Sequence, residues 1–166
     1  MLRPLAAAAV AFSLLSAGGP AVAANPPTAE DCILYDAAFK AVVPHLEESW
    51  RHGEYRRFAA STFDRVRDEH AAGRRPGPHL SLKYCVALQQ RVSAAGLDFV
   101  VRAPFGLRLP DSAPYEHFSS PVRDGATVYL TYYFSAVQGM NLTLHQGPDG
   151  QWTADEPAWW ELVLVT

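Results

Sequence analysis

The spacing of apolar residues changes its period near Leu97, and this change constrains the fold more than any other feature of the chain. Before Leu97 the apolar side chains recur at helical spacing, and after it they alternate with polar ones. We expect helices within residues 28–53, 55–73 and 81–96, and strands at 98–102, 115–120, 126–136, 140–146 and 159–165. This order predicts an α+β domain in which three N-terminal helices pack on one face of a C-terminal antiparallel meander sheet.

The two central strands predict their own register. Apolar residues occupy even-numbered positions from Val128 to Phe134, so these side chains share one face of the sheet. A two-residue loop would mix the faces of the hairpin. We therefore expect a three-residue loop at 137–139, which pairs Phe134 with Leu142 and places Gly139 at a left-handed bulge position.

The first 24 residues differ from the rest of the chain. Arg3 precedes an eleven-residue apolar run, Leu5–Leu15, and the small residues Ala21–Ala24 follow. This arrangement is typical of a secretory signal peptide. Eleven helical residues span roughly 16 Å, about half of a bilayer core, which argues against a membrane anchor. We expect cleavage after Ala23 or Ala24 and a single mature domain, residues 25–166, with no transmembrane segment.

Export gives the two cysteines a specific meaning. Cys32 and Cys85 are the only cysteines, so one intramolecular disulfide is possible. Both fall on the apolar faces of predicted helices, and a bond between them would tie the first helix to the third. The alternative is a catalytic thiol, but neither cysteine lies in a Cys-x-x-Cys motif. The abundance of alanine and arginine indicates a bacterial source with a GC-rich genome, so the compartment we expect is the periplasm or the exterior.

The odd-numbered positions of the central strands gather aromatic and hydrogen-bonding side chains. Such side chains are typical of a small-ligand pocket or a docking surface. The alternative is the solvated face of a half-buried sheet, because Thr and Tyr favour strands in any case. The candidate ligand-binding residues are Tyr129, Thr131, Tyr133, Asn141, Thr143 and His145.

His145 also fits the role of a general base, oriented by Glu161 if their strands are neighbours. No nucleophile motif accompanies it, so we assign no catalytic residue. The six histidines show no metal-ligand spacing. We therefore expect neither a metal ion nor a cofactor.

Charge is unevenly distributed along the chain. The formal net charge of -3 argues against a nucleic-acid partner. Residues 51–91 nevertheless hold nine cations, centred on Arg74 and Arg75. They indicate either a basic patch for an anionic envelope component or a solvated helix whose charge is balanced by neighbouring acids.

The C-terminal part also contains a set of residues that resembles a pattern in other proteins. They are Phe118–Val122, Asp124, Gly125, Val128, Tyr129, Tyr132, Tyr133, Gly139, Leu142, Leu144, Asp149, Gly150, Trp152 and Trp159, together with Asp31–Ala37 near the start. In these residues, mainly within 118–160, the chain resembles an uncharacterised family of exported bacterial α+β domains. The resemblance implies an α+β domain that ends in hairpins, and it assigns no activity. A weaker likeness is to the nuclear-transport-factor-2-like fold, in which three helices wrap a curved sheet around a pocket.

Two functional hypotheses follow. The first is a non-enzymatic, periplasmic module that binds an envelope protein or another envelope component through its sheet face or basic helices. The second is a pocketed domain, similar to nuclear transport factor 2, that binds a small ligand or performs acid-base chemistry with His145. The second hypothesis requires Tyr129, Tyr133 and His145 to line a closed cavity under the helices.

Overall fold

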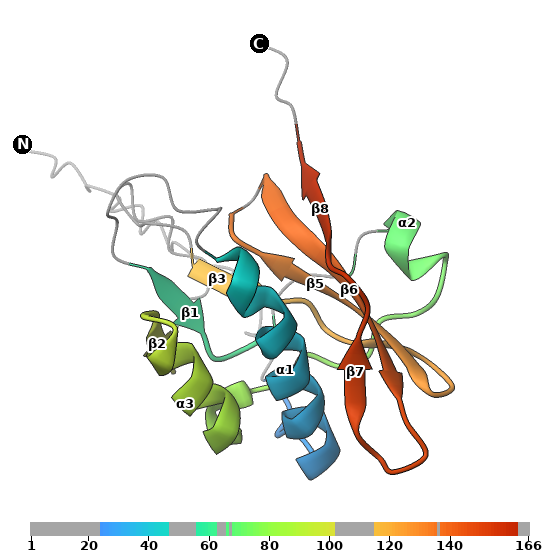
Figure 1. Ribbon diagram of the computed structural model, residues 1–166, viewed down its shortest axis with the longest axis horizontal. Helices are drawn as coiled ribbons and strands as arrows, with labels where there is room; N and C mark the ends of the chain where they lie inside the picture. The colour runs from blue at the N-terminus through green and yellow to red at the C-terminus, as the bar shows by residue number, and fades with distance from the viewer. Residues whose placement is uncertain are drawn as a thin grey trace, which may run out of the picture.

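The structure is a computed structural model that describes residues 24–46, 56–62, 66, 68–101, 115–135 and 137–162. Within these residues, helices α1 (Ala29–Val42) and α3 (Val86–Ala94) pack on one face of a curled, mixed sheet of eight strands (Figure 1). The strands are β1 (Arg57–Ala59), β2 (Asp98–Val100), β3 (Tyr115–Phe118), β4 (Val122–Asp124), β5 (Thr127–Tyr133), β6 (Gln138–Gln146), β7 (Trp152–Ala154) and β8 (Ala158–Glu161). Shorter helical segments are η1 (Val43–His45), α2 (Asp68–Ala71) and η2 (Leu82–Tyr84).

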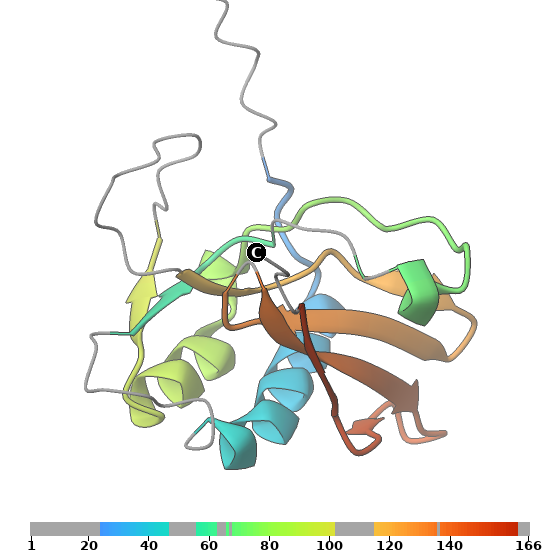
Figure 2. The same cartoon turned by 90° about the horizontal axis from the view of Figure 1, so that it is seen from above.

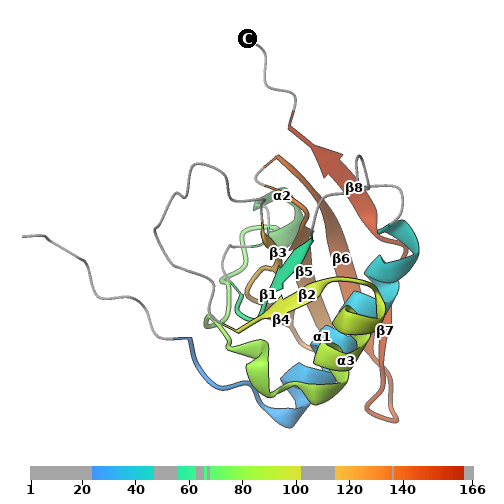
Figure 3. The ribbon, with the colours of Figure 1, turned by 90° about the vertical axis from the view of Figure 1, so that its left-hand side faces the viewer.

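Helix α1 begins at a reciprocal cap. The Thr28 hydroxyl accepts a hydrogen bond from the Asp31 backbone N–H (3.1 Å), and the Asp31 carboxylate accepts one from the Thr28 backbone (2.9 Å). One face of the helix is fully buried, through residues such as Leu34, Tyr35 and Phe39. Figure 3 shows α1 and α3 side by side against the sheet. The predicted continuation of the first helix, residues 47–53, lies outside the described residues.

The sheet combines antiparallel and parallel pairs. Its order is β2-β1-β3-β5-β6-β7, with β4 also paired to β5 and β8 to β6. Strand β1 runs parallel to both β2 and β3, whereas the pairs from β3 through β8 are antiparallel. In Figure 2, α1 and α3 lie on one side of the sheet, and α2 with the loop that follows it lies on the other.

The prediction of three helices on an antiparallel meander is wrong. Within the segment expected to form the second helix, residues 57–59 form strand β1, and the described helical part is the single turn α2. The reason is packing. The Phe58 ring stacks on Phe99 (5.7 Å between centroids) and lies edge-on to Phe118 (5.9 Å), so the segment is buried between two neighbouring strands. A short apolar run fits a buried strand as well as a helix, and tertiary contacts decide between them.

The hairpin of β5 and β6 keeps the predicted faces in a different register. Tyr132 pairs with Met140, and the Phe134 backbone N–H donates to the Gln138 carbonyl (3.1 Å), so the turn lies two residues earlier than predicted. A shift by an even number preserves which side chains share a face. Gly139 lies within β6 instead of in a left-handed bulge. A Cβ atom there would collide with the Tyr132 carbonyl oxygen and the Trp160 ring.

The even-numbered face of β5 and β6 carries the core. Leu130, Tyr132, Met140 and Leu142 are completely buried beneath α1 and α3. The polar and aromatic odd-numbered residues therefore face away from these helices. No helix in the described part of the chain has the length and apolar character needed to cross a membrane.

The predicted disulfide is confirmed. Cys32 of α1 and Cys85, which precedes α3, are bonded with a Cα–Cα distance of 5.0 Å. A second link between the same two helices is the two-pronged contact of Arg91 with the Asp36 carboxylate (2.7 and 2.9 Å).

Replacing both cysteines by alanine should lower the free energy of unfolding by about 2–5 kcal/mol, because the bond spans a sequence separation of 53 residues and restricts the unfolded chain. Urea denaturation of the wild type and the C32A/C85A variant measures the loss. Dithiothreitol should destabilise the wild type to a similar extent and leave the variant unchanged. Two reactive thiols in the native, unreduced protein would contradict the bond.

Candidate functional site

The structure brings the predicted binding residues together on the outer face of the sheet, the face away from α1 and α3. Tyr129 lies opposite Thr143, Thr131 opposite Asn141, and His145 opposite Thr127 on the neighbouring strand. His145 is therefore at one end of this face and Tyr133, which pairs with Gly139, is at the other. The second hypothesis needed Tyr129, Tyr133 and His145 beneath the helices, and their side chains lie on the opposite face.

Protein groups already occupy the middle of the outer face. The Arg74 guanidinium lies over the Tyr129 ring (5.0 Å to its centroid) and forms an ion pair with Asp124 (2.6 Å). His70 of α2 contacts the Leu142 carbonyl oxygen through Nε2 (2.9 Å) and lies edge-on to Tyr129 (5.3 Å). The α2 segment and the loop after it therefore cover the Tyr129 ring, which we predicted to bind a ligand.

The polar groups nearby are equally engaged. Thr131 is fully buried, and its hydroxyl donates to the Asn141 side chain (3.1 Å). The Tyr133 ring stacks on His117 (4.9 Å) and meets the edge of Trp160 (5.5 Å). These contacts stabilise the sheet and leave little free aromatic surface at this end of the face.

His145 lies between a hydroxyl and a carboxylate. Its Nδ1 is 3.1 Å from Thr127 Oγ1, and its Nε2 is 3.2 Å from Asp155 Oδ2. Glu161, the partner expected from the sequence, instead accepts a hydrogen bond from Gln138 (2.9 Å). The side chains of His145 and Asp155 are about half exposed, at 48% and 60%. The row of groups resembles an acid-base relay, but water reaches its members.

A buried polar network connects the loops under the N-terminal segment, and sequence reasoning missed it. Ser120 Oγ lies 3.3 Å from His79 Nδ1, which is the geometry of a serine–histidine pair. The same Nδ1 lies 3.0 Å from the Thr62 carbonyl oxygen, which only accepts hydrogen bonds. Nδ1 must therefore carry the proton, so it is not a base for Ser120. The network is structural.

A second buried cluster joins Arg56, Glu116 and Tyr132. Arg56 forms an ion pair with one oxygen of the Glu116 carboxylate, and the Tyr132 hydroxyl donates to the other (2.5 Å). Burial raises the pKa of Glu116, although the hydrogen bonds from Arg56 and Tyr132 oppose the rise. The alternation of the sequence contains the signal for this site, because Glu116 shares its parity with the core residue Phe118. Both carboxylate oxygens are occupied, which is typical of a structural cluster.

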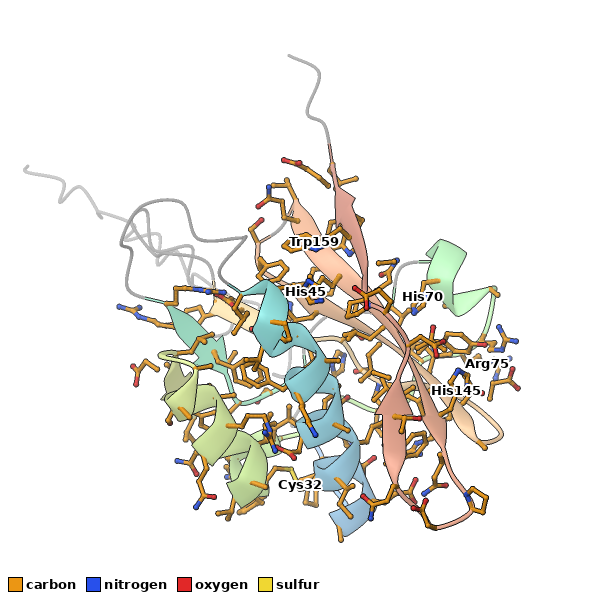
Figure 4. All side chains as sticks on the ribbon, in the orientation of Figure 1. Cys32, His45, His70, Arg75, His145 and Trp159 are labelled. Atoms are coloured by element: carbon orange, nitrogen blue, oxygen red, sulfur yellow. A yellow bond between two sulfur atoms is a disulfide. The ribbon has the colours of Figure 1, made fainter. Side chains whose placement is uncertain are left out.

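The predicted basic patch divides into two places. Arg74 belongs to the outer face. Arg75, which Figure 4 shows on the same side of the molecule as α2, lines a groove of about 510 Å³ that also includes residues at the start of α1. The side chain of Arg75 makes no hydrogen bond or ion pair within the described residues. The groove is lined by Thr28, Glu30, Asp31, Arg75, Pro76, Gly77, Pro78, Leu80, Pro121 and Arg123; Arg123 is a residue that sequence reasoning missed.

Arg123 fixes the charges on one wall of this groove, which we call the Arg75 groove. Its guanidinium bridges Glu30 (2.8 Å) and Asp31 (2.7 Å). Burial by itself would raise the pKa of Asp31, but the hydrogen bonds from Thr28 and Arg123 outweigh it and lower the pKa below its ordinary value. The Asp31 carboxylate is therefore ionised at neutral pH, and Arg123 pairs with it and with Glu30. Arg75 remains as the cation that is available to an outside anion.

The described residues contain no group of three His, Cys, Asp or Glu side chains arranged to hold a metal ion. Comparison with known proteins adds no further residue assignment: no family model, curated protein or solved structure matches the chain. The geometry of the chain itself therefore carries the functional interpretation.

Asp31→Asn should lower the free energy of unfolding by about 1–2 kcal/mol at pH 7, because the variant loses the charged half of the reciprocal cap with Thr28 and the ion pair with Arg123. The folded-state pKa of Asp31 is depressed, so its contribution is present above the ordinary value and is lost as the pH falls. The stabilities of wild type and variant should therefore converge below pH 3.8. Urea denaturation across this range measures both effects.

Glu30→Gln is the matched control, because Glu30 is half exposed and contacts the same Arg123. Its loss should stay within about 1 kcal/mol, as for other surface ion pairs. If the Asp31 variant is as stable as the Glu30 variant, the role of Asp31 in the reciprocal cap is contradicted.

Proposed function

We propose that the chain is an exported, non-enzymatic binding module of the bacterial cell envelope, and that it binds an anionic group in the Arg75 groove. One observation carries this proposal. The groove has the volume of a small-ligand site and presents a guanidinium that no described carboxylate neutralises. The other candidate surface, the outer sheet face, is already filled by Arg74, His70 and the stacked rings.

The walls of the groove favour a preformed site. Pro76, Pro78 and Pro121 restrict the backbone, and Gly77 donates its N–H to the Pro121 carbonyl, which ties the two walls together (2.6 Å). A guanidinium binds carboxylate and phosphate groups through paired N–H donors. The ligand we propose is therefore an envelope component that carries a carboxylate or a phosphate.

Export is the second part of the proposal. Residues 1–24 would act as a signal peptide, and cleavage after Ala23 or Ala24 would release the chain into the periplasm. The Cys32–Cys85 bond supports this, because such bonds persist in oxidising compartments. The apolar leader, which ends in small residues, supports it independently.

Acid-base chemistry at His145 is a second candidate, favoured by the contacts with Thr127 and Asp155. It predicts that His145→Gln abolishes a hydrolytic activity against a simple ester such as p-nitrophenyl acetate. Asp155→Asn should then reduce the same rate, and Glu161→Gln should not. Equal rates in wild type and His145→Gln would exclude this candidate.

The binding proposal is tested by titrating the isotopically labelled protein with inorganic phosphate and following backbone amide signals by NMR. Shifts should concentrate at residues 28–31, 75–80 and 121–123. Arg75→Gln should weaken binding at least tenfold, because it removes the unpaired cation. Arg74→Gln is the matched control, since Arg74 lies outside the groove and contacts Tyr129 and Asp124 instead.

Two results would overturn the groove as the binding site. One is phosphate binding of equal strength in wild type and Arg75→Gln. The other is a set of shifts confined to the outer face, around Tyr129 and His145. Retention of an intact leader on the exported protein, measured by mass spectrometry, would reject the signal peptide without affecting the groove.

A further inference from the structure

Large apolar side chains gather on the surface around the disulfide. Ile33 is 50% exposed, Tyr84 61% and Val86 62%. Each of them is the direct chain neighbour of a bonded cysteine. We call these three residues the disulfide patch; Cys32 marks its place at the end of α1 where the helix begins (Figure 4).

The disulfide holds the patch together. The Cα atoms of the bonded cysteines are 5.0 Å apart, and each step to a chain neighbour adds 3.8 Å. The Cα atom of Ile33 therefore lies within about 13 Å of the Cα atoms of Tyr84 and Val86. Ile33 points away from the core because Leu34 and Tyr35 occupy the buried face of α1. The three exposed side chains therefore lie at one end of the α1–α3 pair, on backbone that the disulfide joins.

The charged group beside the patch is a lysine. The Lys83 ammonium lies 4.7 Å from the centre of the Tyr84 ring, and no carboxylate pairs with it among the described residues. Exposed apolar side chains flanked by Tyr and Lys are the combination that rests at a bilayer interface, with the amine near anionic headgroups. The acids closest along α1 are held by arginines: Glu30 and Asp31 by Arg123, and Asp36 by Arg91.

The leader joins the fold beside this surface. Asn25 pairs with Leu80, and its carbonyl accepts the Ser81 backbone N–H (2.8 Å), two residues before Lys83. Between Leu15, the end of the apolar run, and Ala24 the chain spans at most about 32 Å when extended. Before cleavage of the proposed signal peptide, the apolar run in a bilayer would keep the patch close to the membrane surface, and after cleavage the patch alone would hold the chain there. This step rests on the proposed signal peptide.

We propose that the disulfide patch is a membrane-contact surface that docks the protein reversibly on a bilayer containing anionic lipid. Ile33, Tyr84 and Val86 would enter the headgroup boundary, and Lys83 would contact the lipid phosphates. The Arg75 groove would remain open to the envelope component that it binds. The small apolar area makes the contact weak and reversible.

The two lysines of the chain provide a direct test. Lys83 lies in the patch, and Lys40 is exposed near the other end of α1, about 10 Å further along the helix than Ile33, so it serves as an internal control. Vesicles of phosphatidylglycerol and phosphatidylethanolamine should slow acylation of Lys83 by an N-hydroxysuccinimide ester at least fivefold relative to Lys40. Phosphatidylcholine vesicles should protect it less. Mass spectrometry of the exported protein reads both sites at once.

Flotation with the same vesicles gives the second readout. The Tyr84→Ser/Val86→Ser double variant should reduce the bound fraction at least tenfold, and Lys83→Gln should reduce the preference for anionic vesicles. Leu162→Ser is the matched control, because Leu162 is 44% exposed and directly follows β8, a strand that Figure 1 shows far from the start of α1. Its binding should equal that of the wild type.

Equal acylation of Lys83 with and without vesicles would overturn the proposal, as would equal flotation of the double variant and the wild type. A wild-type dimer in lipid-free buffer that the double variant converts to a monomer would also overturn it, because a second copy would then cover the patch. Arg75→Gln should bind vesicles normally. Failure of the groove as a ligand site is therefore distinguishable from failure of the patch.

Discussion

The attachment of α1 to the sheet is the constraint on which the other features depend. The Tyr35 hydroxyl donates a hydrogen bond to the Ser119 carbonyl oxygen in the core (3.0 Å). Arg123 of β4 forms ion pairs with Glu30 and Asp31 in the first turn of the helix. The disulfide and the Asp36–Arg91 pair then join α3 to α1. The Arg75 groove and the disulfide patch both lie at the N-terminal end of this helix. The positions of their residues therefore depend on the same contacts between α1 and the sheet.

Local pattern predicted the parts of the fold whose contacts are local or strongly periodic. The helices around residues 29–42 and 86–94 follow from their apolar faces and from the cap at Thr28. The faces of β5 and β6 follow from the alternation of apolar residues. Their register does not, because two hairpins that differ by an even shift bury the same side chains. The reason for a glycine at position 139 is the close approach of the Trp160 ring, and the position of that ring cannot be read from the local sequence.

The local sequence pattern could not predict the parallel strand β1. Phe58 owes its conformation to Phe99 and Phe118, which are distant in the sequence. The candidate site shows the same limit. The sequence identified the outer face and Arg75, but it did not show that Arg74 covers Tyr129, or that Asp155 rather than Glu161 would contact His145. Each of these pairings is decided by a loop whose path depends on the assembled sheet.

The parallel pairing of β1 with β3 also has a consequence for the order of folding. It joins Arg57 to Tyr115, so loop-closure entropy opposes the sheet until a chain of that length is available. The disulfide needs only the segment as far as Cys85. In a chain that becomes available from its N-terminus onward, Cys32 and Cys85 can therefore be joined before β3 pairs with β1. The closed loop contains β1, so it restricts the positions that this strand can occupy until β3 pairs with it.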